Sequence, residues 1–165
     1  EVTVTVKVDI PAGAADGNYM TLQDQGHAGP RDGPAGDVLV IIQEEEHPYF
    51  DRQDADVLYE LPISFSQAVL GDRTEIPTLT GKVRLTIPEG TQSGKVFRLR
   101  GKGLPHLNGY GQGDQLVKIT VWTPINLSDK EKNLYRELAQ LDGGKAPKRD
   151  KGFFDRLKEE LGFGE

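Results

Sequence analysis

Apolar and polar residues alternate at the start of the chain. Aliphatic side chains occupy the even positions of Val2–Ile10, with Thr, Lys and Asp between them. A period of two residues is typical of a β-strand with one buried and one solvated face. Residues 11–17 are rich in Gly and lead to a second short apolar segment at Tyr19–Leu22. This pattern predicts a hairpin between the two segments.

The pattern changes to a continuous apolar run after a Gly- and Pro-rich loop at residues 26–36. Residues 37–44 (DVLVIIQE) contain five consecutive apolar residues, which predicts a strand buried on both faces. A short turn or helix is expected at 66–71. The same reasoning predicts further strands at 57–65, 75–79, 82–88, 95–101 and 115–124. We expect the segment 95–101 to be the hairpin partner of 82–88.

Near the C-terminus the period lengthens to between three and four residues. Ser128 and Glu131 match the S-x-x-E capping box that begins a helix, so the sequence predicts one amphipathic helix over residues 126–141. Its apolar stripe follows the last strand and has no obvious sheet to cover, which indicates a dimer contact. The residues expected to make that contact are Leu134, Tyr135, Leu138 and Leu141.

Residues 142–152 (DGGKAPKRDKG) have the composition of a flexible tether. Large apolar side chains then recur at near-helical spacing among charged residues: Phe153, Phe154, Leu157, Leu161 and Phe163. Leaving such side chains in water forfeits about 1.5 to 3 kcal/mol each, and so short a helix is marginal alone. We expect this tail to dock on its own or a partner subunit, with Phe153, Phe154 and Leu157 contributing to dimerisation.

The chain also repeats itself. Residues 6–42 align without a gap on residues 83–119, a shift of 77 positions. The identical pairs are mostly turn glycines, a proline and apolar positions, which are residues that specify a backbone path: Val6/Val83, Ile10/Ile87, Pro11/Pro88, Gly13/Gly90, Gly17/Gly94, Leu22/Leu99, Gly26/Gly103, Gly36/Gly113, Asp37/Asp114, Leu39/Leu116, Val40/Val117 and Ile42/Ile119. Such a period predicts two tandem β-rich units.

The two copies differ in completeness, because residues 57–79 precede the second copy and only residues 1–5 precede the first. We therefore expect a mainly β fold of two tandem β-sandwich-like domains, the first truncated and open at one edge. The expected organisation is the C-terminal part of a first domain at 1–50, a second domain at 51–125, the helix at 126–141, and a linker with a short amphipathic tail at 142–165.

The amino-acid composition argues against several classes of function. The 165 residues contain no Cys, which excludes disulfides and thiolate zinc sites within the chain and fits a reducing, cytoplasmic setting. A net charge of −6 argues against nonspecific nucleic-acid binding, although Arg98, Arg100 and Lys102 share one strand face and Arg84 is expected opposite them. A solvated outer face is the better interpretation of these cations. No apolar run is long enough to span a membrane.

Candidate chemistry is sparse. His27, His47 and His106 lie singly in loops, without the close spacing of metal ligands. The glycines of 101–113 lie between strands, whereas a phosphate loop leads from a strand into a helix. No arrangement of acid, base and nucleophile is apparent, so the sequence predicts a binding protein that is not an enzyme. A groove for an extended peptide, lined by Val6 and Val40 with Tyr19 and Leu22 nearby, competes with ordinary sandwich core.

Long ordered segments of the sequence resemble the C-terminal region of the bacterial DnaJ family of J-domain co-chaperones. They include GDVLVIIQEEEHPYFDRQDADVLYELPISFSQAVLG, GKVRLTIPEGTQSGKVFRLRGKGLP and KGFFDRLKEEL, and the resemblance covers essentially the whole chain. It implies two similar substrate-binding domains followed by a dimerising helix. It also implies that a J-domain and a zinc-binding Cys-rich insertion belong to the full protein, so that no cofactor is expected in this chain.

The resemblance implies that Val6 and Val40 match the family's apolar peptide pocket. For these two residues it therefore favours a peptide-binding groove over sandwich core. It implies a fragment that binds unfolded or extended apolar polypeptides, forms a homodimer, and in the full protein delivers clients to a DnaK-type ATPase chaperone. Neither nucleic acid nor membrane is expected as a partner. A carbohydrate-binding or hydrolytic β-sandwich is the alternative, and it would require a polar cleft in the loops.

Overall fold

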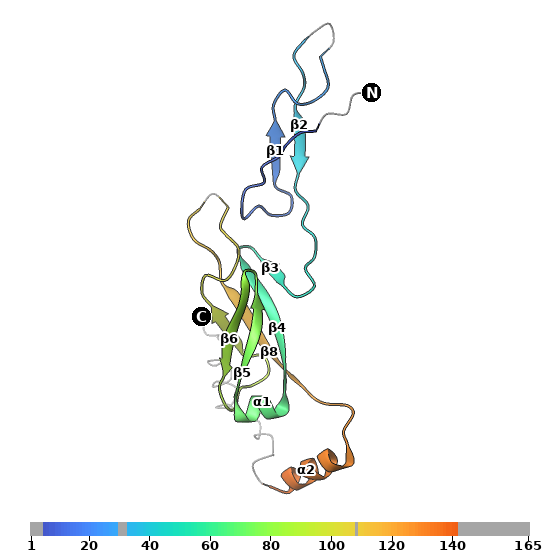
Figure 1. Ribbon diagram of the computed structural model, residues 1–165, viewed down its shortest axis with the longest axis vertical. Coiled ribbons are helices and arrows are strands. Elements are labelled where there is room, and N and C mark those ends of the chain that lie inside the picture. Colours follow the sequence, from blue (N-terminus) through green and yellow to red (C-terminus); the bar gives the residue numbers. More distant parts are fainter. Residues whose placement is uncertain (1–4, 30–32, 108, 142–165) are drawn as a thin grey trace, which may run out of the picture. The chain divides into compact units, whose positions relative to one another are not determined.

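The computed structural model describes residues 5–29, 33–107 and 109–141. It is mainly β with several sheets and two helices, which confirms the predicted fold class (Figure 1). The elements are β1 (Tyr19–Leu22), β2 (Val38–Ile41), β3 (Asp51–Gln53), β4 (Asp56–Ser64), α1 (Phe65–Leu70), β5 (Asp72–Thr78), β6 (Gly81–Ile87), β7 (Val96–Leu99), β8 (Gln115–Trp122) and α2 (Asp129–Gln140).

The strands form three sheets. β1 pairs with β2, β5 pairs with β6, and the largest sheet has the order β3-β4-β8-β7. The expected pairing of 95–101 with 82–88 is therefore wrong, because β6 pairs in full register with β5, from Asp72 opposite Ile87 to Thr78 opposite Gly81. The two-residue connection between β5 and β6 allows a tight hairpin, which closes more readily than a pairing across a longer loop.

Residues 5–10 do not form a strand, although the alternation of their side chains predicts one. A strand needs a hydrogen-bonded neighbour. The repeat aligns residues 5–10 with β6, whose partner is β5. The described residues of the first copy contain no counterpart of β5. The alternating pattern thus indicates that residues 5–10 are amphipathic, but no strand among the described residues pairs with them.

The hydrophobic core lies between the β5–β6 hairpin and the sheet that contains β4 and β8, which form two layers (Figure 1). The side chains that alternate toward this interior are at most 8% exposed: Leu61, Ile63, Ile76, Leu85, Ile87, Val117 and Ile119. The residues between them, such as Glu60, Arg84 and Lys118, point away from it, as the period of two predicts, although Thr78 and Gln115 are also buried. This is the sandwich expected for the second copy.

The backbone confirms the repeat that the sequence predicts. In the first copy the amide of Gly26 donates to the carbonyl of Gly36 at 2.6 Å, and in the second copy Gly103 donates to Gly113 at 2.8 Å. A Cβ at Gly26 would lie 2.7 Å from the Gly36 oxygen, and one at Gly103 would lie 2.6 Å from the Gly113 carbonyl carbon. The shared glycines are therefore required by the same close crossing of two loop segments.

Other bonds recur at the same shift of 77 positions. Gly17 donates to Ile42 at 3.0 Å, and Gly94 donates to Ile119 at 2.7 Å. A carboxylate caps the same loop in both copies, since Asp37 accepts from the Asp24 amide at 3.1 Å and Asp114 from Gly101 at 2.8 Å. The two copies thus share loop geometry as well as sequence.

Arg52, on β3, ties the loop that precedes β1 to the segments on either side of β3. Its guanidinium donates to the carbonyl oxygens of Ala14 at 2.9 Å, Gly13 at 3.1 Å and Asp54 at 2.8 Å, and it forms an ion pair with Glu44 at 3.3 Å. The planar fork of arginine satisfies these acceptors together, which lysine cannot do. Arg52 is therefore the main polar anchor of this loop.

Replacing Arg52 with Ala should loosen the loop without unfolding the second copy's sandwich. Hydrogen bonds from a charged donor contribute about 1.5 to 3 kcal/mol net, which corresponds to roughly tenfold to 150-fold faster exchange of the Ala14 and Asn18 amides. Amide hydrogen exchange measures this directly. Arg52→Lys keeps the charge but loses the fork, so it should reproduce most of the effect; full protection in either variant would contradict the anchoring role.

Both helices begin with the same device. Ser64 caps α1 with Gln67, and Ser128 caps α2 with Glu131, which confirms the capping box that the sequence predicts at Ser128. The Ser128 hydroxyl and backbone amide both donate to the Glu131 carboxylate and hold its pKa below the ordinary value. Neither α1 nor α2 is long and apolar enough to cross a lipid bilayer.

Candidate functional site

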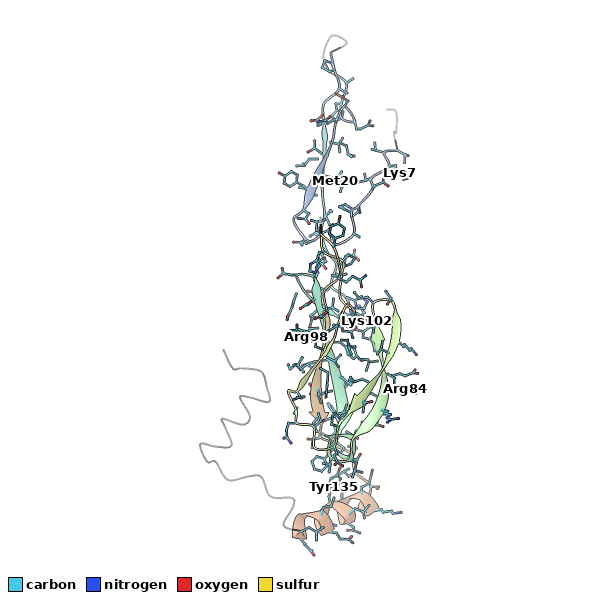
Figure 2. The ribbon with its side chains drawn as sticks, turned by 90° about the vertical axis from the view of Figure 1, so that its left-hand side faces the viewer. Lys7, Met20, Arg84, Arg98, Lys102 and Tyr135 are labelled. Carbon is cyan, nitrogen blue, oxygen red and sulfur yellow. The ribbon has the colours of Figure 1, made fainter. Side chains whose placement is uncertain are left out.

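The β1–β2 hairpin carries the first candidate site. Its antiparallel register sets Tyr19 opposite Ile41 and Met20 opposite Val40. Because side chains alternate across a strand, Tyr19, Leu39 and Ile41 share one face. That face is open to solvent, with exposed fractions of 71%, 57% and 66%. The other face holds partly buried residues and includes Met20, which is labelled in Figure 2.

The four residues predicted to bind peptide do not all share a surface. Leu22 and Val40 lie on the same, partly buried face of the hairpin, whereas Tyr19 points to the opposite, exposed face. Val6 is half-buried and lies outside both strands, on the segment before β1. The structure therefore brings Leu22 and Val40 together and separates Tyr19 from them. The predicted burial of the 38–42 run on both faces is wrong.

The two copies of the repeat expose equivalent residues to different extents. Val117 and Ile119 are fully buried, but their counterparts Val40 and Ile42 are only partly buried. Ile87 is 1% exposed, whereas its counterpart Ile10 is 64% exposed. Positions that form core in the second copy are thus partly uncovered in the first. This contrast leaves apolar surface next to a two-stranded sheet whose outer edges pair with no other strand of the described residues.

The polar residues around this site are engaged in structural contacts. His47 accepts a hydrogen bond from the Tyr49 amide at 3.1 Å, and its ring lies 5.0 Å from that of the buried Phe50. No group of three His, Cys, Asp or Glu side chains within the described ranges could hold a metal ion.

The predicted basic stripe is divided between two sheets. Arg84 lies on β6 and faces Glu75 of β5 at 4.0 Å, whereas Arg98 lies on β7, which pairs with β8 (Figure 2). The expectation that Arg84 stands opposite Arg98 is therefore wrong. The order of strands in a sheet depends on contacts between residues that are far apart in the sequence. The spacing of basic residues along the chain therefore does not predict it.

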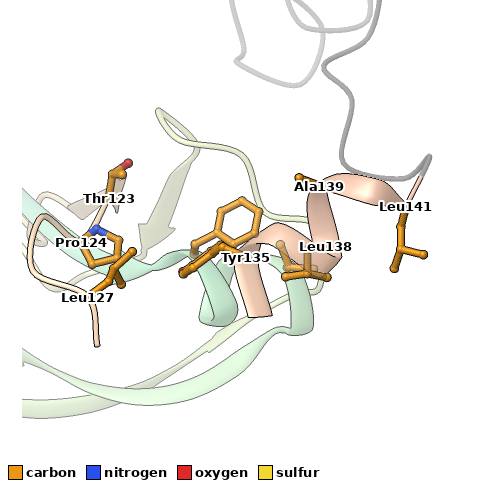
Figure 3. A pocket seen from close by; sticks show the side chains of 9 residues that line it. Thr123, Pro124, Leu127, Tyr135, Leu138, Ala139 and Leu141 are labelled. Atoms are coloured by element: carbon orange, nitrogen blue, oxygen red, sulfur yellow. The ribbon is translucent and has the colours of Figure 1, made fainter. Parts of the chain in front are cut away.

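A second candidate site is an apolar groove with a volume of about 620 Å³. It is bounded by α1, by the segment that leaves β8, and by α2 (Figure 3). Its lining contains no charged side chain: Phe65, Val69, Thr123, Pro124, Leu127, Tyr135, Leu138, Ala139 and Leu141. The spacing of apolar residues in 126–141 indicates the α2 side of this groove, but nothing in the sequence marks Phe65 and Val69 as part of it, because apolar residues in a helix of six residues are usually core.

No residue of α2 is buried. The four side chains predicted for dimerisation are exposed by 51% at Leu134, 39% at Tyr135, 51% at Leu138 and 62% at Leu141. Tyr135, Leu138 and Leu141 line the groove, whereas Leu134 does not. Phe153, Phe154 and Leu157, which were predicted to join this contact, lie outside the described residues.

Comparison with known proteins gives a consistent result. The family model described as the DnaJ C terminal domain matches residues 1–124. The chain is 50% identical over 157 residues to the Chaperone protein DnaJ of Ruminiclostridium cellulolyticum, covering 95% of this chain and 41% of that protein. It is 48% identical over 153 residues to the protein of the same name from Shouchella clausii, covering 93% and 41%. The chain therefore spans about two fifths of the length of these relatives.

Proposed function

Because the chain belongs to the DnaJ C-terminal domain family, we propose that it is the client-binding and dimerising part of a co-chaperone. Its substrates are unfolded or extended polypeptides with apolar side chains. In the full protein it would pass these clients to a DnaK-type ATPase chaperone in the cytoplasm, without itself catalysing a reaction. It requires no cofactor of its own for this task.

The observation that carries the proposal is the uncovered apolar surface of the first copy. Val40 is partly exposed although its repeat counterpart, Val117, is fully buried. An extended peptide can add a strand to an open sheet edge and place alternate side chains on such a surface. The partly buried face of the hairpin, with Leu22 and Val40, suits the peptide's apolar side chains.

Val6 and Tyr19 complete the proposed site in different ways. Val6 lies on the segment before β1, where an amphipathic stretch could line one side of the groove. Tyr19 is on the opposite face of the hairpin and would contact a peptide only where the chain passes around the edge of β1. We therefore expect Tyr19 to contribute less than Val6 or Val40.

Replacing Val40 with Asp should weaken binding of a fluorescently labelled, extended apolar peptide roughly tenfold, because a carboxylate is costly against an apolar side chain. Fluorescence anisotropy measures the affinity, and suppression of aggregation of an unfolded protein gives a second readout. Thr21→Asp is the matched control, since it puts the same charge on the exposed face of the same hairpin. Equal affinity of the Val40 variant and the unaltered chain, with unchanged thermal melting, would remove Val40 from the site.

We assign dimerisation to α2, through Leu134, Tyr135, Leu138 and Leu141. An amphipathic helix whose apolar face is exposed along its length is unstable in isolation and is stabilised by packing. A twofold symmetric contact would let each stripe cover its copy in the partner subunit. Two linked subunits would also bind one long client at two sites, which raises the overall affinity.

A further inference from the structure

None of the described residues fills the apolar groove between α1 and α2. Its exposed apolar side chains would be stabilised by an occupant that covers them. Its volume of about 620 Å³ falls within the range of roughly 300 to 1,000 Å³ typical of sites that enclose apolar ligands. Phe65 is 50% exposed and Val69 is 46% exposed, although both belong to a helix that packs on the sandwich through Ala68. An uncharged lining selects an apolar occupant.

We propose that the groove is filled by the C-terminal segment of the same chain, residues 153–163. Leu141, the last described residue, itself lines the groove, so the chain leaves from its rim. A further 24 residues follow it. The eleven residues of the tether 142–152 can span about 36 Å when extended, so the segment reaches any part of the groove.

The sequence of the segment fits the groove in chemistry and spacing. Phe153 and Leu157 are four residues apart, as are Leu157 and Leu161, so one helical face carries the apolar side chains. Asp155, Arg156, Lys158, Glu159 and Glu160 occupy the remaining positions, which would face water. A helix docked by this face covers Phe65, Val69 and Tyr135 and leaves no charge in the groove.

A tethered segment has an advantage over a second copy or a client peptide. A short flexible linker gives an effective concentration on the order of millimolar, about a hundredfold above a protein concentration of about 10 μM. Leu134 does not line the groove. The docked segment therefore leaves Leu134 accessible but covers Tyr135, so it would compete with a dimer contact made through Tyr135, Leu138 and Leu141. It is independent of client binding at the β1–β2 hairpin.

Disulfide trapping in the full chain tests this, because the natural sequence has no Cys and two introduced thiols are the only ones present. Val69→Cys combined with Lys158→Cys, which leaves every apolar side chain of the segment in place, should form an intramolecular disulfide at least tenfold faster than Leu79→Cys combined with Lys158→Cys. Leu79 is the matched control because it is 40% exposed and lies outside the groove. Equal rates in the two variants would overturn the proposal, and so would a disulfide that joins two chains.

Amide exchange provides a second readout that does not depend on cysteine. In the full chain, Phe154→Ser should raise the exchange rate of the Val69 and Leu70 amides severalfold, because removing the docked segment exposes α1. Glu159→Ser, on the opposite face of the segment, should leave those rates unchanged. Protection of α1 that is identical in the Phe154 variant and the unaltered chain would contradict docking.

Discussion

Replacing Ile119 with Asp is expected to abolish the cooperative unfolding of the second copy's sandwich. Ile119 is fully buried in β8, whose neighbours in the sheet are β4 and β7. Removing a buried isoleucine side chain alone costs about 2 to 5 kcal/mol, and an unpaired carboxylate in its place adds several more. Since domains of this size are stable by only about 5 to 15 kcal/mol, most of the stability is lost.

The repeat supplies a matched control for this variant. Ile42 is the counterpart of Ile119 in the first copy and is only partly buried. Ile42→Asp should therefore change the stability by about 1 kcal/mol or less. Circular dichroism and the fluorescence of Trp122, the only tryptophan, would follow the melting of both variants. Equal melting temperatures would mean that the two copies share a core after all.

Replacing Leu134 with Glu should convert a dimer into monomers. A leucine side chain contributes about 1.5 to 3 kcal/mol when buried, and a symmetric interface buries it twice. The loss of roughly 3 to 6 kcal/mol raises the dissociation constant by about a hundredfold to ten-thousandfold. Sedimentation velocity at micromolar concentration separates the two states.

Asn133→Glu is the control for this variant, since it adds the same charge to an exposed polar position of α2. It should remain dimeric, although it removes the hydrogen bond that Arg136 donates to Asn133 at 2.6 Å. A Leu134→Glu chain that stays dimeric at micromolar concentration would exclude α2 as the main dimer contact. A monomeric unaltered chain would exclude dimerisation through this region altogether.

Local elements were predictable because the residues that specify them are close together in the sequence. The capping box of Ser128 and Glu131 begins α2 where the spacing indicates, and the short apolar segments at 57–65, 82–88 and 115–124 all contain strands. The repeat was also readable, since its shared glycines impose the same crossing of loop segments in both copies. These signals need no knowledge of which segments meet.

Strand pairing was not predictable, since it depends on contacts between distant residues. The pattern at 82–88 favours a strand equally well beside 72–78 or beside 96–99, and the short β5–β6 turn decides between them. For the same reason the alternation at residues 5–10 did not produce a strand. The candidate peptide site was predicted in part, with Leu22 and Val40 on one face and Tyr19 on the other.

The sequence by itself determined the family, the duplicated loop geometry and the positions of both helices and most strands, because these follow from long ordered motifs, from local periodicity and from glycines at close crossings of the backbone. It did not indicate β3, and it predicted a strand at residues 5–10 that does not form. Only the tertiary structure decided which of the equivalent apolar residues are covered. Val40 and Val117 are the same residue in the same local pattern, yet one is partly exposed and the other fully buried. Burial depends on whether a second layer of structure packs against a strand, and the sequence of the strand does not specify that layer. The groove between α1 and α2 likewise depends on packing, because its lining comes from residues far apart in the chain.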